Sequence, residues 1–520
     1  MSYKKLLCPW CFLLMFFLPH EISAQDKEAQ AKYLSTLSFE ETVKRADSAC
    51  EKQDYSTALF YYRIALNEAH RENNKAGLSK TFERIITVSE KAEEKKLDSL
   101  VTLYKTGPAL EKAGNEALQK GDTLAASLYL GTAIKIAQRD RNLNAEAALL
   151  INRGMLFALQ KNYPRAIDHR RRAMVLLRDN DNPLMAARQL SVMGLNYPFI
   201  GMNDSALACH HEALRIYRRL GNKPGEGEAL GNIGSIYGVS GPPDSALKYF
   251  NDALVIYRGI PQRDRVADQL VNLGSVHKGT KHYQEALAGY REAADIYREL
   301  DHIEGLAFSL EGMAISYSLL HHIDSAIASY RKAAEYFSRL AEKKKEVFLL
   351  TDAALLYIVL DNEAETVKQL DNVEQLYTRI GEADFTVERL SYISTQLYEM
   401  KRPALAMKYF EKLLEIYRRD GNRPKEALML SMLGSCAYQL EESEEAYDKL
   451  NRSLDISREI DDLEGQVSTL TILGLLKKSE SEFEEALQYL ETAMDLLKKA
   501  GNNSGQEAMQ GLINELKSMM

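Results

Sequence analysis

The sequence predicts an all-α protein, a solenoid of antiparallel helix pairs. Three observations support this fold class: an alanine that recurs every 40 residues, a glycine at a fixed distance before it, and the lack of alternating β-branched runs typical of strands. At 520 residues the chain is too long for one ordinary core, and an array that grows by repetition accounts for the length. Hydrophobic residues make up 45%, which excludes a disordered chain.

The alanine defines ten consecutive registers without an insertion or a deletion. Seven residues after it a second small residue recurs in most units, and seven residues are about two helical turns, so both lie on one stripe of one helix. The residues in the alanine register are Ala126, Ala166, Ala206, Ala246, Ala286, Ala326, Thr366, Ala406, Ala446 and Ala486.

The glycine lies twelve residues before the alanine. A glycine inside a helix costs about 1 kcal/mol relative to alanine, so its recurrence indicates a repeated need for close helix approach. We therefore place the glycine on the first helix of each pair and the alanines on the second. The glycines are Gly114, Gly154, Gly194, Gly234, Gly274, Gly434 and Gly474.

The predicted helix ends agree with this assignment. Asp204, Asp244 and Asp324, each followed by a serine, are expected to cap the second helices. Gly221 and Gly421, each followed by an asparagine, are expected to end second helices in a left-handed conformation.

The pattern resembles the tetratricopeptide-repeat family. The family's order of signature residues is present as Leu273-Gly274, Ala286, Tyr290 and Ala293, with His277 in place of the first aromatic. The units are longer than the usual repeat of about 34 residues and are similar to kinesin light chain-type repeats. The resemblance covers residues 108 to 499. It implies a right-handed superhelical solenoid whose first helices line a concave groove.

Five regions follow from the pattern. Residues 1–24 are a predicted signal peptide and 25–107 an irregular helical region with about two degenerate repeats. Residues 108–341 form the first part of the array and 342–500 a second part. Residues 501–520 form a capping helix. A joint before the second part is suggested by the charged stretch 341–346 and by drifted signature positions. Two drifted repeats with unchanged packing are the alternative.

The N-terminus predicts export to the periplasm or out of the cell. Lys4 and Lys5 precede an apolar run of 14 residues, Leu6 to Pro19, and Ala24 ends a predicted cleavage site. The run is too short for a permanent membrane span, and no later run reaches 18 apolar residues, so we expect no stable membrane insertion.

The formal net charge is −8, which argues against nucleic acid as a partner. One basic run departs from that average: Arg170-Arg171-Arg172, with Arg165 and His169 nearby. We interpret the run as a solvated helix face.

Recognisable catalytic, phosphate-binding and zinc-binding motifs are missing from the predicted mature sequence, so we expect no enzyme activity, no cofactor and no metal. Neighbours such as His210 and His211 point about 100° apart on a helix, which makes a poor chelate. His210 is expected to be a packing residue, because that register holds Phe250, Tyr290 and Phe410 in other units.

The candidate peptide-binding residues are Asn152, Asn232, Asn272, Arg188 and Lys278, in registers that would line the groove. The family resemblance implies that asparagines two residues before the glycine bond the backbone of a bound peptide. An amide can donate and accept, so it suits an extended chain of any sequence. The alternative is that these asparagines tie neighbouring repeats together.

The sequence thus favours an exported scaffold that binds a protein or peptide partner. The alternative is an extracytoplasmic sensory module acting through a separate membrane signalling partner. The partner's identity and the oligomeric state are left open by the sequence.

Overall fold

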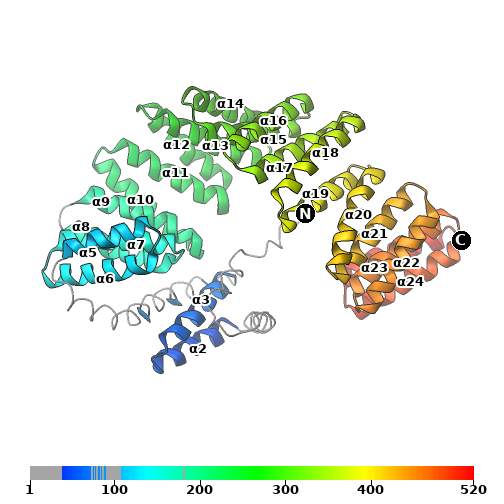
Figure 1. Ribbon diagram of the computed structural model, residues 1–520, viewed down its shortest axis with the longest axis horizontal. Coiled ribbons are helices and arrows are strands. Elements are labelled where there is room, and N and C mark those ends of the chain that lie inside the picture. Colours follow the sequence, from blue (N-terminus) through cyan, green and yellow to red (C-terminus); the bar gives the residue numbers. More distant parts are fainter. Residues whose placement is uncertain are drawn as a thin grey trace. The chain divides into compact units, whose positions relative to one another are not determined.

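The computed structural model describes residues 38–71, 107–179 and 182–520, with seven single positions between 74 and 88. The predicted signal peptide and half of the irregular region before residue 107 lie outside these residues. The described part is helical and contains no strand (Figure 1). The chain divides into two compact units, residues 1–276 and 277–520.

First and second helices alternate along the array (Figure 1). The first helices are α5 (Gly107–Gln119), α7 (Leu143–Leu159), α9 (Pro183–Asn196), α11 (Lys223–Ser240), α13 (Arg263–Gly279), α15 (Ile303–Leu319), α17 (Lys343–Val359), α19 (Ala383–Glu399), α21 (Arg423–Gln439) and α23 (Leu463–Ser479). The second helices are α6 (Thr123–Arg139), α8 (Tyr163–Asp179), α10 (Asn203–Arg219), α12 (Pro243–Arg258), α14 (Tyr283–Glu299), α16 (Ile323–Arg339), α18 (Glu363–Ile380), α20 (Pro403–Arg419), α22 (Ser443–Glu459) and α24 (Phe483–Lys499).

Six of the predicted glycines pack against their own second helices: Gly114, Gly154, Gly194, Gly234, Gly434 and Gly474. A Cβ on Gly234 would lie 2.7 Å from the Phe250 ring, and one on Gly474 would lie 2.8 Å from the Leu490 side chain. A Cβ on Gly474 would also lie 3.3 Å from the carbonyl oxygen of Ala486, the alanine of the same unit. All ten side chains of the alanine register, Thr366 included, are fully buried. The small residues therefore set the spacing within each helix pair.

The second-helix caps were predicted wrongly. Second helices α10 and α16 begin at Asn203 and Ile323, one residue before the aspartates expected to cap them. Asp204 and Asp324 lie in the first turn, where the helix dipole favours a carboxylate. The predicted stops are confirmed, since Gly221 and Gly421 have φ angles of 63° and 66°.

Helix α9 is shorter than its counterparts because Pro198 interrupts it. Proline has no backbone N–H, so it cannot bond the carbonyl four residues earlier, which is that of Gly194. The chain continues as a 3₁₀ turn, η3 (Tyr197–Ile200). The buried ring of His210 hydrogen-bonds the Gly194 backbone instead. His210 is thus a packing residue, as expected, and it also replaces the missing donor.

The two ends of the described chain are also helical. α2 (Phe39–Glu51) packs against α3 (Tyr55–Arg71), and Asp54 accepts the Thr57 N–H at 3.2 Å at the start of α3. At the other end, α25 (Asn503–Lys517) packs on α24 and buries Met509, Ile513 and Leu516. This last helix covers the apolar side of the final repeat.

Candidate functional site

Successive first helices contact one another as well as their own second helices, as α5 and α7 do, or α21 and α23. Side chains that point away from both kinds of contact lie on what we call the first-helix face. All five sequence-predicted binding residues are on first helices.

The predicted asparagines differ in their surroundings. Asn152 is half-buried, and its Nδ2 donates to Asn115 Oδ1 on the preceding first helix at 3.3 Å. Asn232 is half-buried, and its Nδ2 is shielded from water without a hydrogen-bond partner in the described structure. Asn272 is half-buried on α13. Val192 holds this position on α9, so the row of amides is interrupted there.

The two predicted cations also differ. Arg188 is exposed on α9, whereas Lys278 is half-buried in the last turn of α13. Glu228 occupies the position of Arg188 on the next first helix, α11, and is exposed as well. A cation and an anion thus stand on neighbouring first helices, four residues before the amide position.

An apolar strip runs along the other side of the amide positions in residues 107–276. Leu195 and Phe199 contribute from α9 and η3, and the Phe199 ring stacks on Tyr163 with centroids 4.5 Å apart. The strip consists of Met155, Leu159, Leu195, Phe199 and Val239, with exposed fractions of 43%, 63%, 46%, 56% and 89%.

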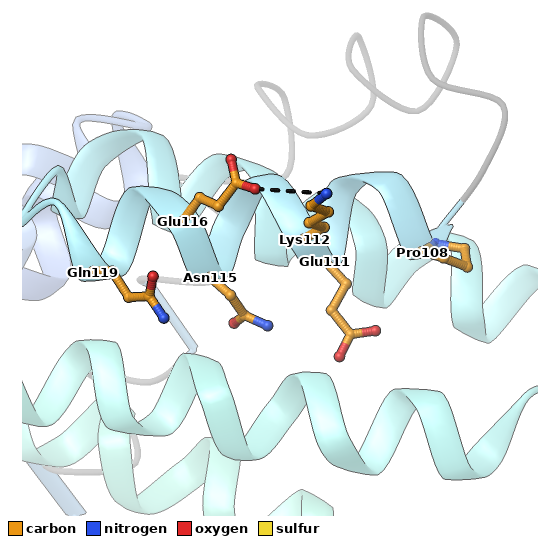
Figure 2. A pocket seen from close by; sticks show the side chains of 6 residues that line it. All are labelled: Pro108, Glu111, Lys112, Asn115, Glu116 and Gln119. Carbon is orange, nitrogen blue, oxygen red and sulfur yellow. Dashed lines mark ion pairs between the residues drawn. The ribbon is translucent and has the colours of Figure 1, made fainter.

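A shallow hollow of about 430 Å³ lies over α5. Figure 2 shows its six lining residues, all of them from that helix: Pro108, Glu111, Lys112, Asn115, Glu116 and Gln119. Lys112 and Glu116 form an ion pair at 4.0 Å across one helical turn. Because one helix supplies every wall, this hollow is the first stretch of the first-helix face and not an enclosed pocket.

In residues 277–520 the first-helix face carries contacts between aromatic rings and charges, beside the exposed Leu319 and Val359. Lys345 on α17 reaches back to α15, where its Nζ lies 3.6 Å from the Phe308 ring centroid and 3.0 Å from Glu311 Oε2. The same Nζ is 4.3 Å from the ring centroid of Phe337. The Lys345 ammonium group therefore links the repeat that begins with α17 to the preceding repeat, α15 and α16.

A second contact of this kind joins α17 and α19. The buried Arg389 guanidinium lies 3.6 Å from the Phe348 ring centroid, and Tyr392 donates its hydroxyl to Asp352 Oδ1 at 2.7 Å. Burial raises the pKa of Asp352, although the hydrogen bond from Tyr392 and the charge of Arg389 act the other way. Farther along, the hydroxyls of Tyr398 and Ser435 are 2.6 Å apart.

The interpretation of the basic run as a solvated face is wrong for three of its five residues. Arg165, His169 and Arg170 are buried. Arg170 fills the position that Phe250 takes in another unit, and it donates to Gln189 Oε1 at 2.8 Å. Burial and the surrounding guanidinium groups hold the pKa of His169 well below its usual range.

Neither the apolar strip nor the cation–ring contacts were predicted from the sequence. A periodic signal existed for the strip, because its residues lie one and five positions after the glycine on α7 and α9. The cation–ring contacts have no such signal. Lys345 and Arg389 take different registers, so only the structure shows that both cover a ring of the preceding repeat.

The tetratricopeptide-repeat family model matches residues 190–259, 265–339, 385–459 and 425–499. A comparison with curated proteins gave no match. Within the described residues, no helix combines the length and apolar character needed to cross a membrane.

Several solved structures resemble the chain at low identity. The apo quorum sensor NprR from B. thuringiensis is 15% identical, with 75% of this chain and 96% of that one covered and a TM-score of 0.41. A Rap protein complexed with competence and sporulation factor is 16% identical, with 80% and 99% covered and a TM-score of 0.36. A kinesin light chain-like repeat protein from Podosopora anserina is 13% identical, with 39% and 99% covered and a TM-score of 0.34.

Proposed function

Because the chain belongs to the tetratricopeptide-repeat family, we propose that this repeat scaffold binds a peptide or protein partner on the first-helix face of residues 107–276. The observation that carries the proposal is the contrast between Asn152 and Asn232. The first bonds a neighbouring repeat, whereas the Nδ2 of the second has no partner in the described structure. Asn232 is only half-buried as a residue, and rotation of its side chain would bring that donor to a backbone carbonyl of a bound chain.

The remaining surroundings fit binding better than catalysis. Arg188, Glu228 and the apolar strip offer charge and apolar contact beside the amides. Such a surface combines a few polar groups that fix a peptide's register with apolar groups that supply burial.

A matched pair of triple variants tests the site. Asn152, Asn232 and Asn272 changed to alanine should weaken binding of peptides selected from a displayed random library by about tenfold or more. The control changes three exposed asparagines of second helices, Asn251, Asn372 and Asn451, to alanine. Equal peptide affinity of wild type and both variants would show that the three asparagines take no part in binding. If the library yields no peptide that binds wild type, the proposal of peptide binding is contradicted.

We also propose that the protein is exported and acts in the periplasm or outside the cell. The support is the lysine pair, the short apolar run and the small residue Ala24. Mass analysis of the protein recovered outside the cytoplasm should give a chain beginning at Gln25. A Phe16→Arg variant should accumulate inside the cell with its N-terminus intact, and normal processing of that variant would contradict the proposal.

A further inference from the structure

We propose that the apolar strip, together with Arg188 and Glu228, binds an extended segment of a partner protein. The segment carries apolar side chains toward the strip, and an acidic and a basic residue two or three positions apart toward the charged side. This inference rests on the proposed peptide-binding function and names the chemistry of its ligand.

The strip combines exposure with order. Its five members lie on α7, on α9 with η3, and on α11, and the position five residues after the glycine is apolar and exposed in all three units. Single exposed apolar side chains are common on protein surfaces, but neighbouring ones that follow a repeat indicate a binding surface. Val239 is 89% exposed and Leu159 63%, so contact with a partner would remove much apolar surface from water.

An extended occupant is favoured over a helical one by the amides beside the strip. The backbone groups of a helix are paired within the helix, whereas an extended segment leaves its N–H and C=O groups available. The Asn232 donor without a partner lies between the strip residue Val239 and the charged position of α11. A chain crossing the first helices above Asn232 could place side chains to both sides.

The two charges set the order of the partner's polar residues. Arg188 and Glu228 occupy equivalent positions on α9 and α11 and are both exposed. Packed helices lie about 8–10 Å apart, and an extended chain rises about 3.3 Å per residue. An acidic residue facing Arg188 and a basic residue facing Glu228 would therefore be two or three residues apart in the partner.

The test uses the full chain and a displayed library of random linear peptides. Selected peptides should combine apolar side chains with the acidic and basic pair. A strip variant, Leu159→Gln with Phe199→Ser and Val239→Thr, should lose about tenfold or more in affinity. The control is Val175→Thr with Val255→Thr, two valines on second helices that are 48% and 71% exposed. It should bind like wild type. A charge-reversed variant, Arg188→Glu with Glu228→Arg, should prefer peptides with the acidic and basic residues exchanged.

Each other outcome overturns this inference in its own way. If selected peptides lose affinity in the amide variant but bind the strip variant normally, the proposed function stands and the strip has no part in it. If no peptide binds wild type, both fail. If sedimentation shows that wild type self-associates and the strip variant does not, the occupant is a second copy of the chain. Circular dichroism must show equal helix content in all variants.

Discussion

The first helices of residues 107–276 and those of residues 303–439 share one scaffold and use their outer side chains differently. In the first region amides, an exposed cation and exposed aliphatic residues line the face. In the second, Leu319 and Val359 are exposed as well, but Lys345 and Arg389 each cover a ring of the preceding repeat. Phe348 and Tyr392 hold positions equivalent to those of Arg188 and Asn232, so this repeat can use equivalent positions either for a ligand or for contact between repeats.

Charge distribution accompanies this difference. Residues 277–520 contain 43 acidic and 29 basic side chains, so a cation on their first-helix face readily finds a carboxylate, as Lys345 finds Glu311. Residues 1–276 contain 31 acidic and 37 basic ones, a balance in which Arg188 stays exposed on α9.

The largest loss of stability is expected where a buried cation links two neighbouring repeats. Arg389→Ala would remove the stacking on Phe348 and leave the Asp352 carboxyl buried without that positive charge. We expect a loss of about 3 kcal/mol. Hydrogen–deuterium exchange should rise in α17 and α19 and stay unchanged in α7 to α11. The control, Arg419→Ala, removes an arginine whose side chain is 73% exposed. Unchanged protection of α17 and α19 in Arg389→Ala would contradict the claim that cation–ring contacts stabilise the second region.

The shared scaffold should respond equally in both regions. Gly234→Leu and Gly474→Leu both place a side chain where a Cβ already meets Phe250 or Leu490, so each should cost about 2 kcal/mol through overpacking. The control is Gly511→Leu on α25, since nothing lies within 4 Å of a Cβ there. Urea unfolding followed by circular dichroism measures the loss. Clearly unequal losses would mean that the helix pairs are not equivalent.

Acid should weaken residues 107–276 through His210. Burial lowers the pKa of His210 to about 4, below the unfolded value of about 6.5. Between these values the unfolded state binds the proton and the folded state does not, so stability is lost as pH falls. From pH 7 to pH 5 we expect wild type to lose about 1–2 kcal/mol more than His210→Phe. Urea midpoints at both pH values provide the measurement, and parallel curves would contradict it.

The smallest expected effects distinguish a residue that stabilises the contact between repeats from a residue that binds the peptide. Tyr398→Phe removes the hydroxyl that lies 2.6 Å from that of Ser435, so it should cost about 1 kcal/mol of stability without changing peptide affinity. Asn232→Ala should leave stability nearly unchanged and weaken peptide binding. Thermal unfolding and peptide titration of both variants test this pair of statements. Weaker peptide binding in Tyr398→Phe together with lower stability in Asn232→Ala would contradict the roles assigned to the two regions.

The sequence predicted the scaffold better than the site. Alanine and glycine positions are set by close packing between the two helices of a pair, so a strict spacing of 40 residues was enough to pair the helices. Helix starts were missed by one residue because Asp204 suits the first turn as well as the cap. The burial of Arg170 was missed because an arginine takes an aromatic residue's register only where a partner such as Gln189 faces it. The cation–ring contacts depend on neighbouring repeats, and the pattern of a single repeat does not encode them.

The interruption of α9 has a consequence for how such sequences are compared. Pro198 lies four positions after the glycine of its unit and His210 sixteen positions after it. Since the histidine supplies the hydrogen bond that the proline removes, neither residue should drift alone during divergence. Among descendants of this array, a proline at the fourth position should be accompanied by a side-chain donor at the sixteenth. Loss of the proline should free that position to return to phenylalanine or leucine.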